Sequence, residues 1–190
     1  MRTIFILFLI LPFSNLFGQG TFRISGVVTS AINSEPLEYM VILVNGSSEN
    51  GSVTDSLGYY ELDLPKGQVK LTALWIGYEG YDTTLFVNKP LELNFRLTAK
   101  CEYSRESAQS DISKGRPKLL IDGSISVTAF SKEDDKFAHR YKIRYYNLGD
   151  SVYALECIEM YNAEVFQYLD NKYGKSWRED VRPDVIDISE

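Results

Sequence analysis

The sequence predicts two domains, a seven-stranded all-β sandwich and a small α+β domain with a βαβ unit and a long amphipathic helix. Within residues 19–97, short alternating or β-branched runs recur about every ten residues, which is typical of a β-sandwich. Within residues 118–190, apolar residues instead follow helical spacing. Residues 98–117 are polar and rich in serine, and we expect them to form a linker without regular structure.

Length and composition exclude several classes of protein. The chain has 190 residues, of which 44% are apolar and 24% charged, as in ordinary folded proteins. Its 20 Lys and Arg residues against 26 Asp and Glu residues give a net charge of −6, which disfavours binding to nucleic-acid phosphates. One histidine and two cysteines are too few for a four-ligand zinc site of Cys and His residues. We therefore expect no cofactor, no metal and no nucleic-acid partner.

Residues 1–18 are predicted to be a signal peptide. Arg2 gives a positive start, residues 4–13 are apolar, and Gly18 is a small residue at the expected cleavage point. A membrane-spanning helix needs about 20 apolar residues, so we expect export and no integral membrane span after cleavage. In an oxidising compartment Cys101 and Cys157 could form a disulfide. Two separate thiols remain the alternative, because the sequence does not give the Cα separation that a bridge requires.

The β-rich segment divides into seven runs separated by turn residues. In residues 59–64, for example, apolar and acidic residues alternate, which predicts one buried face. Residues 54–59 fit a hairpin turn in which Asp55 binds nearby amides and Gly58 takes a positive φ. Asn45-Gly46 is a further turn signal. The expected strands are residues 22–29, 39–44, 51–54, 59–64, 69–75, 80–87 and 91–97.

Short motifs in this segment occur in the order of a known family: Ile24-Ser25-Gly26-Val27-Val28, Glu35-Pro36-Leu37, Gly51 with Thr54-Asp55, Gly58-Tyr59-Tyr60 and Ile76-Gly77-Tyr78. Residues 21–97 thus resemble the carboxypeptidase regulatory-like domain, a transthyretin-like sandwich of secreted and outer-membrane proteins of gram-negative bacteria. The resemblance implies a non-catalytic module in the periplasm, at the outer membrane or outside the cell. It implies no peptidase, since a metallocarboxypeptidase needs two histidines on zinc and His139 lies outside this segment.

The second domain is expected to begin with a strand at residues 118–121, which Ile125, Val127 and Ala129 could continue. Ser131 and Asp134 resemble a capping box that opens a helix, and residues 142–148 form a second, parallel strand. Residues 155–173 have the spacing of a long amphipathic helix that ends near Gly174. A last short helix would hold Trp177 and Val181 and stop before Pro183.

The same half resembles the FEKKY domain of secreted bacterial proteins. Its naming run corresponds to Phe137-Ala138-His139-Arg140-Tyr141, and the stronger match lies in Tyr161-Asn162, Tyr168-Leu169-Asp170, Lys172-Tyr173-Gly174, Trp177-Arg178 and Val181-Arg182. Ala138 and His139 depart from the naming run. The resemblance therefore implies an architecture and adds little chemistry.

No residue in the sequence is assigned a catalytic, cofactor-binding or metal-ligating role. Trp75, Tyr78 and Tyr81 could stack against a ligand, although strand alternation favours packing. The acidic residues 133–135 are expected to lie at the start of a helix, where the helix dipole stabilises negative charge. The charged residues 178–182 are expected to form a solvated surface.

Two functional hypotheses follow. The first is an exported, non-catalytic binding or assembly module of the bacterial envelope, with an envelope protein or glycan as partner and a role beside outer-membrane transport. The alternative is a small hydrolase or transferase that uses Cys157, His139 and nearby carboxylates, although we expect His139 to face solvent. The oligomeric state is not indicated by the sequence.

Overall fold

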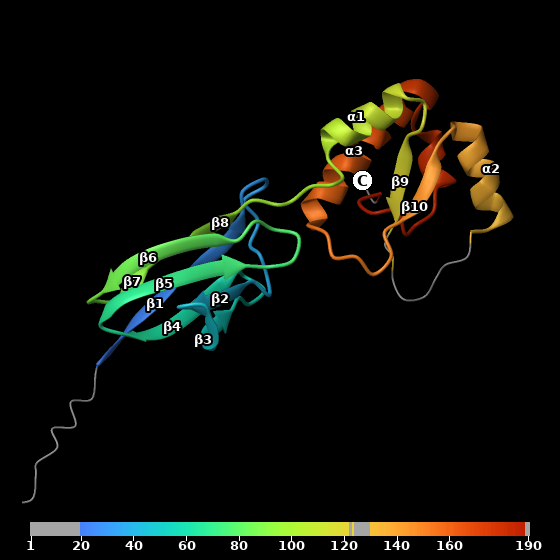
Figure 1. Ribbon diagram of the computed structural model, residues 1–190. Helices are drawn as coiled ribbons and strands as arrows, with labels where there is room; N and C mark the ends of the chain where they lie inside the picture. The colour runs from blue at the N-terminus through green and yellow to red at the C-terminus, as the bar shows by residue number, and fades with distance from the viewer. Residues whose placement is uncertain (1–19, 122, 124–129, 189–190) are drawn as a thin grey trace, which may run out of the picture.

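The computed structural model describes residues 20–121, 123 and 130–188. A β-sandwich, coloured blue to green in Figure 1, is followed by a domain of helices and a small sheet, coloured yellow to red. The expected signal peptide and the expected strand positions Ile125, Val127 and Ala129 lie outside the described residues.

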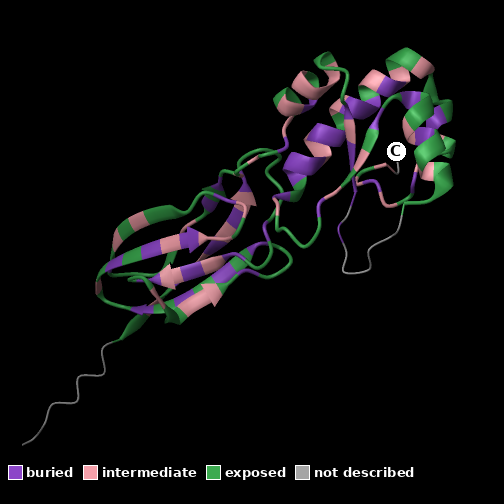
Figure 2. Cartoon of the chain, turned by 45° about the vertical axis from the view of Figure 1, so that its right-hand side comes forward, coloured by how far each residue is buried: buried purple, intermediate pink, exposed green. Residues whose placement is uncertain are grey.

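The sandwich consists of two sheets that bury alternate residues against each other (Figure 2). In the first sheet, β1 (Thr21–Ser30) is the central strand and pairs on one side with β4 (Tyr59–Pro65), which is antiparallel to it. On its other side, β1 pairs with β7 (Leu91–Glu92) and β8 (Phe95–Leu97), both of which are parallel to it. The second, antiparallel sheet has the order β3 (Ser47–Val53), β2 (Val41–Val44), β5 (Gly67–Leu74), β6 (Tyr81–Val87). Ile24, Ile42 and Leu71 are fully buried between the sheets.

Several expectations for the sandwich are wrong in detail. The strand expected at residues 51–54 begins earlier and is β3, Ser47–Val53. The turn at residues 54–59 is not a hairpin, because it joins β3 of one sheet to β4 of the other. Its internal chemistry is as expected: the amides of Leu57 and Tyr59 donate to Asp55 Oδ1, both at 2.9 Å, and Gly58 has a φ of 69°. Asn45 and Gly46 form the turn between β2 and β3, as expected, with φ values of 52° and 79°.

The last expected strand is interrupted. Residues 91–97 form β7 and β8, and the break between them is at residues 93 and 94. There Asn94 Oδ1 accepts a hydrogen bond from the Val27 amide at 2.7 Å, and the Leu93 carbonyl accepts one from the Tyr60 hydroxyl at 2.7 Å. The Leu93 carbonyl also lies directly over Gly26, where a Cβ would overlap with it. Side-chain hydrogen bonds therefore replace part of the sheet ladder at this point.

The second domain is built on a parallel two-stranded sheet, as the sequence predicts. Helix α3 packs on β9, and α1 packs on α3. Ser131 and Asp134 form the expected capping box at the start of α2, and Phe137 and Tyr141 are buried on one face of that helix. The elements are α1 (Arg105–Ser113), β9 (Lys118–Ile121), α2 (Lys132–Tyr141), β10 (Arg144–Asn147), α3 (Leu155–Tyr173) and the 3-10 helix η1 (Lys175–Glu179).

Helix α1 lies inside the segment that was expected to be irregular, so that expectation is wrong for residues 105–113. Its start is fixed by a reciprocal capping box between Ser104 and Ser107. Ala108 is completely buried, and the Tyr103 ring just before the helix meets Tyr161 of α3 edge to face, with 5.7 Å between centroids. A polar helix can thus form here because α3 supplies the surface on which it packs.

The expected solvated surface at residues 178–182 is correct for Glu179 and Asp180, which are exposed, and wrong for Arg178 and Arg182. Arg182 is only 8% exposed and forms ion pairs with Asp134 at 2.8 Å and with Asp184 at 2.6 Å. Arg178 pairs with Asp170 of α3 at 3.1 Å. Because partly buried arginines need such partners, these contacts attach the C-terminal segment to α2 and α3.

Asn162 is the central polar residue of this domain. It is fully buried on α3; its Oδ1 accepts from the Leu120 amide, and its Nδ2 donates to the carbonyls of Leu120 and Ile186, all at 2.9 Å. These bonds connect α3, β9 and the C-terminal segment.

Replacing Asn162 with Leu should lower the free energy of unfolding by about 2–4 kcal/mol, because it leaves the buried Leu120 amide without its acceptor and removes one of the two donors to the Leu120 carbonyl, which keeps the Ile186 amide at 3.2 Å. Urea denaturation followed by tryptophan fluorescence measures the change. Asn171→Leu, on the exposed side of the same helix, is the matched control and should change the stability by less than about 0.5 kcal/mol. Equal effects of the two substitutions would contradict the assigned role.

The structure also indicates where a protease should cut first. Lys114 lies in the exposed turn after α1, whereas the Lys100 amide is hydrogen-bonded and Arg105 lies within α1. Arg116 precedes Pro117, a bond that trypsin does not cleave. We therefore expect limited trypsin digestion of the full chain to begin after Lys114, as mass spectrometry of the fragments would show. First cleavage within residues 21–97 would contradict this expectation.

Candidate binding site at the domain junction

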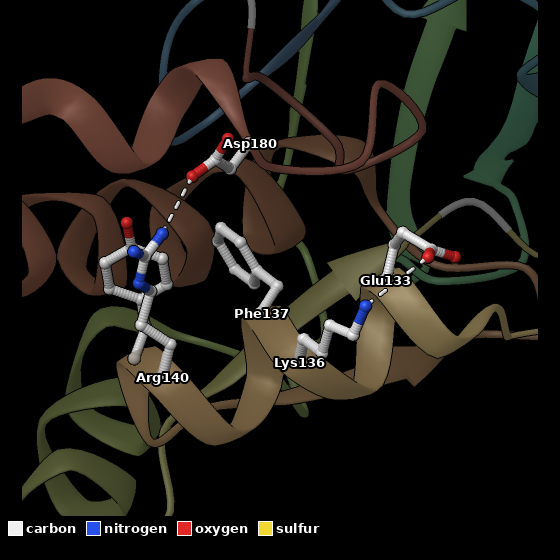
Figure 3. Close-up of a pocket in the computed structure, with 6 residues that line it drawn as sticks. Glu133, Lys136, Phe137, Arg140 and Asp180 are labelled. Atoms are coloured by element: carbon white, nitrogen blue, oxygen red, sulfur yellow. Dashed lines mark hydrogen bonds and ion pairs between the residues drawn. The ribbon is translucent and has the colours of Figure 1, made fainter.

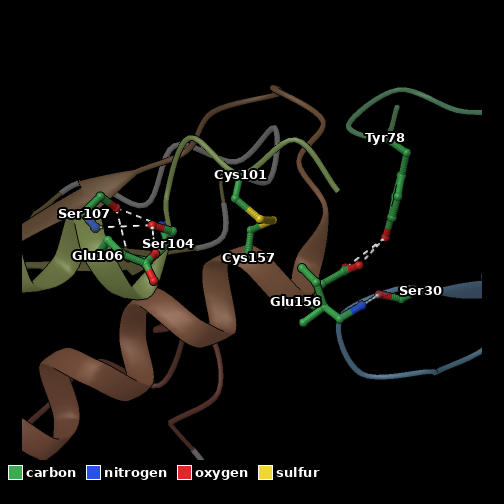
Figure 4. Close-up of a disulfide and its surroundings, with 9 residues drawn as sticks. Ser30, Tyr78, Cys101, Ser104, Glu106, Ser107, Glu156 and Cys157 are labelled. Carbon is green, nitrogen blue, oxygen red and sulfur yellow. Dashed lines mark hydrogen bonds between the residues drawn. A yellow bond between two sulfur atoms is a disulfide. The ribbon is translucent and has the colours of Figure 1, made fainter. Parts of the chain in front are cut away.

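A disulfide joins the two domains where the chain leaves the sandwich (Figure 4). Of the two alternatives that the sequence leaves open, the structure has the bridge: Cys101 and Cys157 are bonded, with Cα atoms 5.4 Å apart. Cys101 follows β8, and Cys157 is in the first turn of α3. The bond therefore fastens the beginning of α3 to the end of the sandwich.

Backbone contacts surround this disulfide. The Lys100 amide donates to the Gly77 carbonyl and the Glu79 amide donates to the Thr98 carbonyl, both at 2.8 Å. Gly77 has a φ of 88°, and a Cβ on it would lie 3.1 Å from the backbone nitrogen of Ala154. Glycine is needed here both for its backbone conformation and for the close approach of the second domain.

Side chains of the second domain also extend into the core of the first. Ala154 and Cys157 are each 2% exposed and belong to the apolar cluster of the sandwich. The junction is thus a packed interface, in addition to a covalent link.

One hydrogen-bonded pair crosses the junction. The Tyr78 hydroxyl, from the loop after β5, donates to the carboxylate of Glu156 on α3 and lies 2.9 Å from each carboxylate oxygen (Figure 4). Both residues are 7% exposed. Burial, and then the carboxylate beside it, raises the pKa of Tyr78 above its ordinary value. Tyr78 therefore stays protonated at neutral pH and can serve as the donor.

A groove of about 430 Å³ opens beside this pair. One wall is the loop between β1 and β2, and the other is the first turns of α3 with the segment before it. Its lining is acidic and aromatic: no Lys, Arg or His is among the described residues that line it. The charged and aromatic lining residues are Glu35, Glu38, Glu156, Glu159, Tyr39, Trp75, Tyr78 and Tyr153.

The loop wall of the groove is held in place by Thr54. Its buried hydroxyl accepts from the Met40 amide at 2.8 Å and donates to the Leu37 carbonyl at 2.6 Å. The Tyr39 amide also donates to the Thr54 carbonyl at 3.0 Å. This side of the groove is thus built on a fixed backbone, which reduces the conformational entropy that the loop would lose when a ligand binds.

The electrostatic environment of the groove is negative. The pKa of Glu159 is raised, first by burial and then by the negative charges of Asp187, Glu35 and Glu156. The carboxylates in the groove repel one another, so a cation bound among them would be stabilised.

The aromatic platform considered from the sequence is only partly present. Trp75 and Tyr78 line the groove, whereas Tyr81 is half exposed on β6 and packs edge to face on Phe95, with 5.8 Å between centroids. The spacing of Glu156 and Glu159, three residues apart on a helix, is a signal that sequence reasoning missed.

The catalytic residues considered from the sequence are not brought together. Cys157 is oxidised in the disulfide and has no thiol available as a nucleophile. His139 is exposed on α2, as expected, whereas Cys157 is buried at the junction. The proposed Cys157 and His139 pair therefore does not exist in this structure.

A second cavity, of about 480 Å³, lies along α2 (Figure 3). Arg140 pairs there with Asp180 at 3.3 Å and Glu133 with Lys136 at 3.7 Å, while the Phe137 ring lies between the two pairs. Both pairs are exposed and internally neutral, so they offer little charge to a ligand. Within residues 20–121, 123 and 130–188, no group of three His, Cys, Asp or Glu residues is arranged to hold a metal ion.

A family model matches the first domain. Residues 24–107 match the family model of the CarboxypepD_reg-like domain, which confirms the resemblance of the sandwich to that family. No curated protein matches the chain. In the part of the chain that the structure describes, no helix is both long and apolar enough to span a membrane.

Several solved structures are similar to the chain. The Bacillus anthracis TIE protein has 19% identity over 42% of this chain, with a TM-score of 0.33, and the match spans only 17% of that protein. A chain of a type II cohesin–X-dockerin complex from Acetivibrio cellulolyticus has 14% identity over 75% of this chain and 94% of its own, with a TM-score of 0.42. The 5-hydroxyisourate hydrolase of Klebsiella pneumoniae has 16% identity over 41% of this chain and 90% of its own, with a TM-score of 0.35.

The disulfide should contribute measurably to stability. Replacing both Cys101 and Cys157 with Ser should lower the free energy of unfolding by about 2–4 kcal/mol, because the bridge closes a loop of 56 residues. Urea denaturation of the oxidised wild type and the double variant measures the difference. Wild type treated with a reductant should unfold like the variant. An oxidised wild type no more stable than the double variant would show that the bond is absent in solution.

Proposed function

We propose that this protein is an exported, non-catalytic binding module whose junction groove takes a segment of a partner protein in the bacterial envelope. The observation that carries the proposal is the groove itself, which contains carboxylates and aromatic rings from both domains and lies at the junction that the disulfide joins. Concave sites lined by aromatic residues with a few charged groups are the usual form of binding sites.

Export is supported by the disulfide and by the composition of residues 1–18. Disulfides persist in oxidising compartments such as the periplasm and the cell surface. The positive start and apolar stretch at the N-terminus have the order of a signal peptide. The second domain, with its likeness to the FEKKY domain of secreted bacterial proteins, supplies α3, which forms one side of the groove. A place beside an outer-membrane transporter of a gram-negative cell is consistent with this assignment.

The hydrolase or transferase alternative loses its main candidates. It required a free thiol at Cys157 near the only histidine, and the structure has Cys157 in a disulfide. A protein partner also fits the groove better than a glycan does. The aromatic rings of the groove lie among carboxylates, which pair with the positively charged groups of a protein.

Site-specific photo-cross-linking tests the proposed function. A benzoylphenylalanine at Leu155, which is 57% exposed at the groove, should form a covalent adduct with a protein in intact cells of the source bacterium. The matched control places the same residue at Leu57, which is 71% exposed in the turn between β3 and β4. We expect a discrete adduct from position 155 only, and we expect it to be lost when Trp75→Ala is added.

No adduct at position 155, or the same adducts from both positions, would overturn the proposed function. A glycan adduct from position 155 would overturn the choice of a protein partner.

A further inference from the structure

We propose that the junction groove recognises a lysine or arginine side chain of the partner segment. This inference rests on the proposed function and adds the chemical class of the group that is bound.

The first argument is the buried carboxylate of Glu156. Its only hydrogen-bond donor among the described side chains is the neutral Tyr78 hydroxyl, and no described Lys, Arg or His lies within ion-pair distance of it. The N-terminal end of α3 offers partial positive charge, which stabilises this one carboxylate. A buried carboxylate usually has a full positive partner.

The second argument is that the surrounding charges have the same sign. Glu35, Glu38 and Glu159 line the groove together with Glu156, and the helix end cannot neutralise all four. Elsewhere in the described chain, partly buried charges are compensated, as at Arg182 with its two carboxylates. The groove thus has an excess of negative charge that a cation from outside would balance.

The third argument is the position of the aromatic rings. Trp75, Tyr39 and Tyr153 line the same groove, and aromatic faces attract cations. The second domain contains an internal example of this combination: the Lys118 ammonium pairs with Asp111 at 3.0 Å and lies 5.7 Å and 5.5 Å from the ring centroids of Tyr103 and Tyr146. The junction groove has the carboxylates and the rings of such a site, and no Lys or Arg is among its described lining residues.

The volume of the groove also fits this occupant. About 430 Å³ is within the range of about 300–1,000 Å³ for ligand sites. It accommodates one long side chain together with part of its backbone, so the partner is expected to present a Lys or Arg on an exposed segment.

An NMR titration of the full oxidised chain tests the inference with defined probes. The charged probe is Nα-acetyl-arginine N-methylamide, and the matched neutral probe is Nα-acetyl-citrulline N-methylamide, which has nearly the same shape. We expect the arginine probe to shift the signals of the Trp75 indole and the Leu155 methyl groups. The citrulline probe should leave them unchanged, and 0.5 M salt should weaken binding of the arginine probe.

Charge-matched variants locate the effect. Replacing Glu35 and Glu159 with Gln should weaken arginine-probe binding by about three- to tenfold, which corresponds to two partly exposed charge contacts. Replacing Glu49 and Glu179, two exposed carboxylates outside the groove, with Gln removes the same charge and should leave binding unchanged.

The outcomes separate this inference from the proposed function. Equal shifts with both probes, or equal weakening by both pairs of substitutions, would overturn recognition of a cation. A protein adduct at position 155 combined with no shift by the arginine probe would also overturn it, and would leave the proposed function standing. Shifts without any adduct would overturn the proposed function.

Discussion

The packed junction around the Cys101–Cys157 disulfide is the constraint on which the binding site depends. The bond places the first turn of α3 against the end of the sandwich, where the backbone of Ala154 would lie only 3.1 Å from a Cβ on Gly77. The Tyr78 hydroxyl then reaches across to Glu156. One wall of the groove comes from each domain. The distance between the two walls is therefore set by this junction.

Charge is distributed unevenly between the two ends of the second domain. Around α2 and the C-terminal segment, Arg182 and its carboxylates neutralise one another and hold the fold together. In the junction groove, carboxylates gather with no Lys, Arg or His among the described lining residues. Repulsion of this kind costs stability, and proteins commonly retain such costs at functional sites. The contrast separates charges that serve the fold from charges available to a partner.

Much of the fold could be predicted from local patterns, because period-two alternation and helical spacing report directly on burial. Helix α1 could not be predicted in this way, because its stability comes from a serine capping box and from packing on α3. The sequence likewise does not show that β3 and β4 belong to different sheets, because strand pairing depends on residues far apart in the chain. The groove could not be predicted, because Tyr78 and Glu156 are 78 residues apart in the sequence and meet only through the disulfide-linked junction.

The account depends most on the claim that the two domains form one unit at this junction. Residual dipolar couplings of backbone amides, measured on the oxidised full chain, test it directly. If the disulfide, the Gly77 contact and the Tyr78 hydrogen bond hold the domains together, couplings from residues 21–97 and from residues 132–179 will fit a single alignment tensor. Two tensors of different magnitude or orientation would show that the domains move independently and that no fixed groove exists between them.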